Sequence, residues 1–70
     1  MRHLYFQHAN GTFTLIHTDV ETEERAWSYI AYDLTKRNPH YKAKKHESYR
    51  DVWNKIWFDV GSQEERYVIM

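Results

Sequence analysis

The side chains best suited to bind an anionic partner lie in one short segment of the chain. Residues 36–46 hold five Lys and Arg, one Tyr and two His, and no acidic residue. In a nucleic-acid interface, Lys and Arg contact phosphates and a Tyr ring stacks on an unpaired base. In a solvated linker, the same charges complement the negative end of a preceding helix and favour solubility. Both interpretations stay open for the candidate binding residues, which are Lys36, Arg37, Tyr41, Lys42, Lys44, Lys45, Tyr49 and Arg50.

The three Trp residues are the other candidates for recognition, because Trp and Tyr anchor protein interfaces as well as small hydrophobic cores. Trp27 and Trp53 recur with apolar neighbours at helical spacing, so we expect them in the core. Trp57 stands beside Phe58 near the end of its predicted element. It is hard to bury together with Trp53, so we expect Trp57 to be partly exposed in a docking patch.

No pattern of His, Ser or acidic residues matches a catalytic or metal-binding motif. A metal site needs ligands about 2.1 Å from one ion, whereas His8 and His17 are expected about 13 Å apart on a hairpin ladder. His46-Glu47 lacks the second His of a zinc-protease helix. The sequence therefore predicts a non-enzymatic protein, with no catalytic residue, metal or cofactor. A minimal metal-independent ribonuclease is the weaker alternative, since His, Tyr, Lys and Arg suffice for that chemistry.

Length and composition limit the class of protein. The chain has 70 residues, no Cys, and ten basic against ten acidic side chains, which excludes disulfides and an overall basic charge. Aromatic residues make up 17% of the chain and favour a folded domain over disorder. No apolar run has the length of a signal peptide or membrane span, which predicts a cytoplasmic protein without membrane contact. We expect one domain over 1–70, and so small a core favours a homodimer.

Asn10-Gly11, between two alternating apolar segments, predicts an N-terminal β-hairpin. Asn-Gly is the preferred pair for a two-residue type I′ turn, because both positions tolerate positive φ. The register of such a turn separates the side chains of the hairpin into two faces. The expected core face is Leu4, Phe6, Phe13 and Leu15, and the mostly solvated face is Tyr5, Gln7, Thr14 and Ile16.

Residues 22–37 are predicted to form an amphipathic helix. Acidic residues lie at its start, Lys36 and Arg37 lie at its end, and Asn38-Pro39 stops it. An apolar stripe at helical spacing is expected to cover the core face of the hairpin, which is not stable alone. The stripe consists of Ala26, Trp27, Ile30, Ala31 and Leu34.

Residues 48–60 fit two structures. Six apolar or aromatic residues have the i, i+3, i+4 spacing of a helix, whereas three alternate as in a strand. We favour a second helix, with Ser48 as its N-cap and Gly61 past its end. If Lys55–Val60 is instead a strand, Gly61–Glu65 becomes a hairpin loop and the element order is ββαββ.

Residues 66–70 predict a C-terminal strand that pairs with the hairpin. The expected fold class is therefore α+β, with an N-terminal β-hairpin packed against an amphipathic helix, then a second helix or strand and the C-terminal strand. For its function, we expect a binding module that docks on another protein as a small regulator or inhibitor, of the kind that phages or mobile elements encode. The alternative is direct binding of nucleic acid through residues 36–50.

Overall fold

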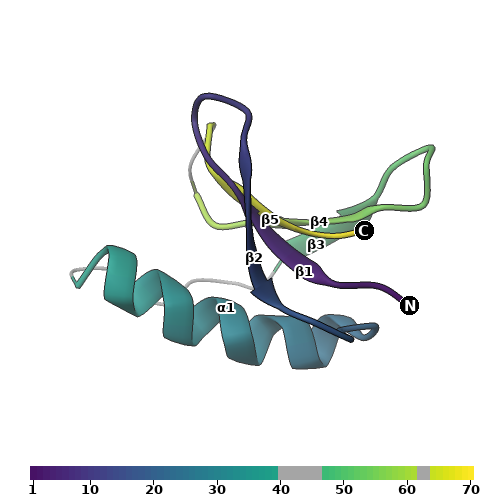
Figure 1. Cartoon of the computed structure of the whole chain (residues 1–70), viewed down its shortest axis with the longest axis horizontal. Coiled ribbons are helices and arrows are strands. Elements are labelled where there is room, and N and C mark those ends of the chain that lie inside the picture. Colours follow the sequence, from purple (N-terminus) through teal and green to yellow (C-terminus); the bar gives the residue numbers. More distant parts are fainter. Residues whose placement is uncertain (40–46, 62–63) are drawn as a thin grey trace.

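The computed structural model describes residues 1–39, 47–61 and 64–70, which form two layers. A sheet of five antiparallel strands has one helix packed against one of its faces (Figure 1). The elements in chain order are β1 (Leu4–Gln7), β2 (Phe13–His17), α1 (Glu23–Arg37), β3 (Glu47–Arg50), β4 (Ile56–Asp59) and β5 (Arg66–Ile69). The expected α+β class is confirmed, and the sheet is larger than the sequence predicted.

The predicted C-terminal strand is the middle strand of the sheet, whose order is β2-β1-β5-β4-β3. β5 pairs antiparallel with β1 on one side and with β4 on the other. Its residues Tyr67, Val68 and Ile69 are fully buried. The pairing continues past the strand ends, where His3 and Met70 exchange two backbone hydrogen bonds of 3.1 Å. The predicted pairing of this strand with the N-terminal hairpin is confirmed.

The predicted helix forms with both of its expected ends. The Thr22 hydroxyl caps the start by accepting a hydrogen bond from the Arg25 N–H at 3.2 Å. Acidic residues in the first turn and basic residues in the last turn complement the helix dipole. Asn38 is the C-cap, and Pro39 follows it. Local signals therefore determine where α1 begins and ends.

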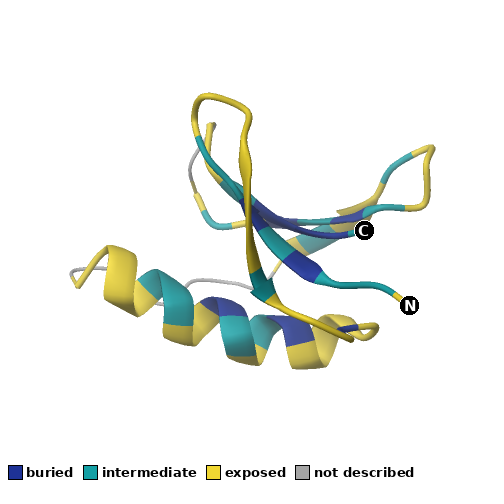
Figure 2. Ribbon diagram, in the orientation of Figure 1, coloured by how far each residue is buried: buried dark blue, intermediate teal, exposed yellow. Residues whose placement is uncertain are grey.

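The hydrophobic core lies between α1 and the sheet (Figure 2). Ala26 and Ile30 are the buried residues of the helix, and they face buried side chains from β1, β4 and β5. Trp27 packs against this cluster and meets Phe58 edge to face at 5.2 Å, in agreement with its expected place. The cluster consists of Leu4, Phe6, Val20, Ala26, Ile30, Ile56, Phe58, Tyr67 and Ile69.

The N-terminal hairpin turns through a three-residue loop and not through the predicted two-residue turn. The His8 N–H donates to the Thr12 carbonyl at 2.8 Å, and the Gly11 N–H donates to the His8 carbonyl at 2.9 Å. Gly11 has a positive φ of +90°, but Asn10 does not. A type I′ turn needs positive φ at both positions, whereas a three-residue loop needs it only at its last residue.

The extra loop residue shifts the strand pairing by one position, so the predicted core face of β2 is wrong. Leu15 pairs with Tyr5, and a β-bulge restores the predicted register only at the open end of the hairpin. Because a one-residue shift exchanges the two faces of a strand, Phe13 and Leu15 lie on the side away from α1. They are 43% and 50% exposed. Ile16, predicted on the solvated face, packs against the core.

The favoured second helix over 48–60 is also wrong, because these residues form β3, a tight turn and β4. The Asn54 N–H donates to the Asp51 carbonyl at 3.1 Å, and the Asp51 N–H donates to the Lys55 carbonyl at 3.0 Å. Asn54 has a positive φ of +64°, so this turn repeats the geometry of the first hairpin. The alternative interpretation, a strand followed by a hairpin loop, is the closer one, and the observed order is ββαβββ.

Three residues assigned to that helix have other places. Ser48 lies in β3, where its hydroxyl donates to the Glu23 carboxylate at 3.1 Å. Gly61 follows β4 with a φ of +87° and therefore belongs to a loop. Trp53, predicted in the core, is 75% exposed, because it lies in the turn between β3 and β4.

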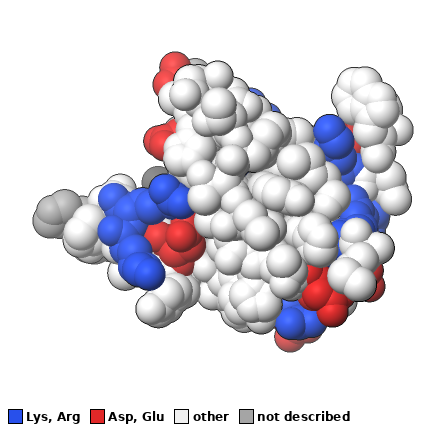
Figure 3. All heavy atoms as spheres, viewed as in Figure 1, with Lys and Arg blue, Asp and Glu red and all other residues white. Residues whose placement is uncertain are grey.

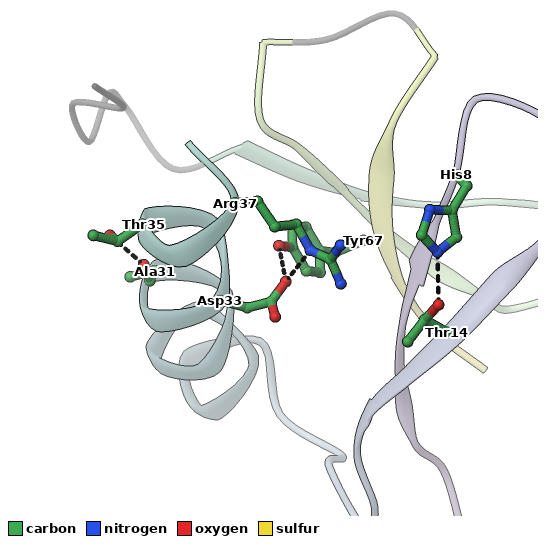
Figure 4. Close-up of polar contacts among 7 residues, drawn as sticks. All are labelled: His8, Thr14, Ala31, Asp33, Thr35, Arg37 and Tyr67. Carbon is green, nitrogen blue, oxygen red and sulfur yellow. Dashed lines mark hydrogen bonds and ion pairs between the residues drawn. The ribbon is translucent and has the colours of Figure 1, made fainter. Parts of the chain in front are cut away.

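Asp33 links the last turns of α1 to the middle of the sheet (Figure 4). Its Oδ2 accepts hydrogen bonds from the Tyr67 hydroxyl at 2.5 Å and from Arg37 Nε at 2.6 Å. The Arg37 guanidinium also lies 4.0 Å from the centre of the Phe6 ring. Burial and the hydrogen bond to Asp33 raise the pKa of Tyr67, so its hydroxyl stays protonated and donates. This contact holds the helix against β5.

Replacing Asn54 by Ala is expected to lower the free energy of unfolding by about 1 kcal/mol, because a non-polar residue with a Cβ is strained at positive φ. Asn54→Gly is the matched control, since it relieves that strain and loses only the exposed side-chain contact with Arg50. Urea denaturation followed by Trp fluorescence measures both variants. Equal losses for Ala and Gly would contradict the role assigned to this backbone conformation.

Tyr67→Phe keeps the ring in the core and removes the hydrogen bond to Asp33. The expected loss in the free energy of unfolding is about 1.5 kcal/mol, as for other hydrogen bonds to charged groups. Asp33→Asn made in the Phe variant is expected to cost less than Asp33→Asn alone, because the main donor to this carboxylate is already absent. Urea denaturation of the four proteins tests the coupling, and strictly additive losses would argue against it.

Candidate docking surface

Strand alternation places a row of uncharged side chains across the sheet face that α1 does not cover. Each of the five strands contributes one residue, and neighbours in the row are paired residues of neighbouring strands. In sheet order the row is Leu15, Tyr5, Val68, Trp57 and Tyr49. We call this set the apolar row, and we call the sheet face that carries it the open face.

The apolar row is exposed at its two ends and closely packed in the middle. Leu15 on edge strand β2 is 50% exposed, and Tyr49 on edge strand β3 is 49% exposed. Val68 in the centre is fully buried, flanked by Tyr5 and Trp57 in the neighbouring strands. No described helix or strand lies over this face, since α1 covers the opposite one (Figure 1).

A second row runs beside the apolar row and is mostly polar. Its members share the open face by alternation and by the same strand register. In sheet order they are Phe13, Gln7, Arg66, Asp59 and Glu47. This polar row places one cation in the middle of the sheet and two carboxylates toward the β3 edge, so the open face carries both signs of charge.

Arg66 connects the two rows. Its Nη1 donates to the Tyr49 hydroxyl at 3.0 Å, and its guanidinium lies 5.8 Å from the Trp57 ring centre. Both contacts cross from the middle strand toward the β3 edge. Arg66 therefore holds two aromatic side chains of the apolar row in fixed positions.

Asp51 positions Trp57 from the turn between β3 and β4. One carboxylate oxygen accepts the Trp57 indole N–H at 2.8 Å, and the other accepts the backbone N–H groups of Trp53 and Lys55 at 2.9 Å each. The hydrogen bond from Trp57, supported by the two backbone bonds, lowers the pKa of Asp51. The side chain that closes the turn therefore also fixes the indole ring of the open face.

The turn itself adds apolar surface next to the open face. Val52 is 88% exposed and Trp53 is 75% exposed. The turn projects to the side of the sheet away from α1, as does the loop between β1 and β2 (Figure 1). The sequence gives a signal for this turn in Asp51 and Asn54, which suit its first and left-handed positions, but helical spacing concealed it.

The structure separates the residues that the sequence grouped as one binding segment. Tyr49, grouped with the basic segment, and Trp57, expected in a separate docking patch, are neighbours on the open face. Lys36 and Arg37 lie at the end of α1 on the other side of the sheet, where Lys36 lies 5.0 Å from the Tyr32 ring centre. In Figure 3, Lys and Arg atoms gather toward the two ends of the molecule, with uncharged atoms between them.

Other predicted binding residues lie elsewhere in the chain. Arg50 ends β3, and its Nη1 donates to Asn54 Oδ1 at 2.7 Å beside the turn. The remaining candidates fall outside the described residues, and they are Tyr41, Lys42, Lys44 and Lys45. Sequence reasoning missed Tyr5, Leu15 and Arg66 as parts of one surface, because only the strand order brings them together.

The described histidines have partners other than a metal ion. His17 stacks on Tyr29 with ring centres 4.0 Å apart, and His8 Nε2 lies 2.6 Å from the Thr14 hydroxyl (Figure 4). Among the described residues, no group of three His, Asp or Glu side chains converges on one point. A hollow of about 540 Å³ opens beside the end of α1, but its described lining residues include no nucleophile next to a base. The lining consists of Phe6, Leu34, Arg37, Asn38, Val60, Gly61 and Glu65.

Comparison with known proteins finds no relative of this chain. No protein-family model, curated protein or solved structure matches the chain. The helical part of the described residues has neither the length nor the hydropathy needed to cross a bilayer.

The Trp57 indole N–H is expected to report the protonation of Asp51. Its chemical shift in an NMR pH titration should change with a midpoint below about 3.9, the ordinary Asp value, because the hydrogen bonds favour the charged carboxylate. This stabilisation is present above pH 3.9 and is lost as the pH falls through the lowered pKa. Asp51→Asn is the control and should abolish the transition. A midpoint at or above 3.9 would contradict the proposed geometry.

Proposed function

We propose that this chain is a non-enzymatic binding module that docks on another protein through the open face of its sheet, as a small regulator or inhibitor. The observation that carries the proposal is the apolar row, which crosses all five strands with no described element over it. Exposed apolar patches bordered by polar residues are typical of protein interaction sites. The proposed location is the cytoplasm, and the proposed origin is a phage or a mobile element.

The residue types on the open face support docking. Trp, Tyr and Arg are the residues that dominate binding energy in protein interfaces, and Trp57, Tyr49 and Arg66 are in contact on this face. Asp51 and Arg66 fix the two rings before any partner arrives. Because these side chains are already ordered, binding costs little additional conformational entropy.

The charges of the open face support a protein partner more than a nucleic acid. Arg66 is accompanied in the polar row by Asp59 and Glu47, whereas a nucleic-acid site needs a surplus of positive charge. A balanced polar rim around an apolar centre is typical of protein interfaces. Direct nucleic-acid binding through residues 36–50 stays a prediction, with residues 40–46 outside the described part of the chain.

Capture experiments with matched variants test the docking proposal. The bait is the full chain, incubated with lysate of the cells in which the protein acts, and bound proteins are quantified by mass spectrometry. Leu15→Arg and Tyr49→Glu change the two ends of the apolar row, and the new Glu still gives Arg66 a partner. Tyr32→Arg introduces a charge at a residue of α1 that is 70% exposed and serves as the control.

We expect the wild type and Tyr32→Arg to capture the same protein. Both open-face variants should lower its recovery about tenfold or more, because they place a charge in an apolar contact. A partner retained equally by all four baits would contradict docking through this face. Salt-sensitive recovery of RNA or DNA in place of a protein would favour the nucleic-acid alternative.

A further inference from the structure

We infer that, in the absence of another partner, a second copy of this chain occupies the open face, so that two sheets pack face to face in a symmetric dimer. Such a dimer completes a sandwich of helix, sheet, sheet and helix, in which both faces of each sheet are covered. The inference deepens the proposed function by naming how the docking face is regulated. Only its last step, competition between the second copy and another protein, depends on that function.

The exposed area is close to what a weak dimer needs. The side chains that face away from α1 or project on that side include Phe13, Leu15, Tyr49, Val52 and Trp53, which are 43–88% exposed. At about 200 Å² for a fully exposed large side chain, they offer about 600 Å² per copy. A standard interface buries about 800 Å² per partner. The half-buried Tyr5 and Trp57 add to this area, which lies in the range of small and weak interfaces.

The charges on the open face select one of the two ways to stack the sheets symmetrically. A two-fold axis parallel to the strands through β5 would place Arg66 opposite Arg66 of the second copy, and like charges repel. A two-fold axis along the apolar row instead places each strand above the same strand of the second copy. The polar row of one copy then lies above the residues on the other side of the apolar row in the second copy. These residues include Lys55, which shares the side of Trp57 by strand alternation.

In this second arrangement the rim charges at the two ends of β4 are complementary. Asp59 lies two residues from Trp57 on one side, and Lys55 lies two residues from it on the other. The two-fold rotation therefore sets Asp59 of each copy against Lys55 of the other, which gives two symmetric ion pairs at the rim. The same rotation brings Glu47 toward Asp51 of the other copy at the β3 edge, where the Asp51 carboxylate already accepts the Trp57 indole N–H and two backbone N–H groups. At the centre, the half-exposed rings of Tyr5 and Trp57, which flank the buried Val68, meet the same rings of the second copy, so apolar surface meets apolar surface.

A face covered in this way is closed to any other protein. Docking as proposed above then requires the dimer to dissociate, and the partner competes with the second copy for the apolar row. Because both complexes use the same residues, the dimer dissociation constant sets how much of the chain is free to dock at a given concentration.

Sedimentation equilibrium of the full chain from about 1 to 300 µM tests the inference. We expect the mass to rise with concentration from 8.7 kDa to twice that value. Leu15→Arg should raise the dissociation constant about tenfold or more, since it buries a charge without a partner. Tyr32→Arg, which carries the same new charge on α1, should leave it unchanged. Circular dichroism confirms that each variant is folded.

The rim contact has its own test, which does not change the apolar row. Lys55→Glu places a second carboxylate opposite Asp59 of the other copy and is expected to weaken the dimer about fivefold. Adding Asp59→Asn, which keeps the oxygen that accepts the Gly61 N–H, should recover about half of that loss on a logarithmic scale. The two positions are about 13 Å apart within one strand, beyond the screening length at physiological salt, so recovery reports a contact between copies.

The outcomes separate this inference from the docking proposal. Three results would overturn the inferred dimer and leave docking intact. The chain could stay a monomer at all concentrations, or Leu15→Arg could fail to weaken the dimer. The third such result is that Asp59→Asn recovers none of the loss caused by Lys55→Glu. Conversely, if Leu15→Arg abolishes the dimer but captures the partner as well as Tyr32→Arg does, docking through this face is wrong and the dimer stands.

Discussion

The backbone pairing of β5 between β1 and β4 is the constraint on which the rest of the structure depends. Without this strand, the N-terminal hairpin and the β3–β4 hairpin have no contact through the sheet, because the order is β2-β1-β5-β4-β3. The last strand of the chain therefore joins two hairpins that are distant in sequence. Its fully buried residues, Tyr67, Val68 and Ile69, show how completely its neighbours surround it. Such non-local pairing has a large loop-closure cost, which local signals alone do not offset.

Alternation along β5 gives the protein two different surfaces from one strand. Tyr67 points to the helix, where its hydroxyl donates to Asp33 and its ring lies 5.0 Å from the Phe6 ring. Arg66 and Val68 point to the other side, where Arg66 contacts Tyr49 and Trp57. The same backbone thus organises a covered core and the open face. A change that displaces β5 would disturb both, so the core and the open face are physically linked in this chain.

Local signals in the sequence predicted the elements but not how they assemble. The helix ends, the hairpin and the C-terminal strand follow from caps, turn residues and alternation. The predicted register of the first hairpin was wrong because Asn10-Gly11 suits both a two-residue and a three-residue loop. The additional loop residue moves Phe13 and Leu15 from the core to the open face. The helix predicted over residues 48–60 was wrong because the apolar residues of a strand, a turn and a second strand happen to have the spacing of a helix. Asp51 and Asn54 were the residues that indicated the turn. The apolar row results from the strand order, which no local pattern encodes.

The one helix among the described residues covers only one face of the five-stranded sheet. This helix has 15 residues and is about 22 Å long. Its buried residues pack against the core face of the sheet. Leu15 and Tyr49 at the ends of the apolar row are about half exposed, so a second molecule that covered them would remove more of their apolar surface from water. Any molecule that binds the folded chain and not the unfolded one stabilises it in proportion to the logarithm of its concentration over its dissociation constant. The face that contributes little to the stability of the isolated chain would therefore contribute more in a complex.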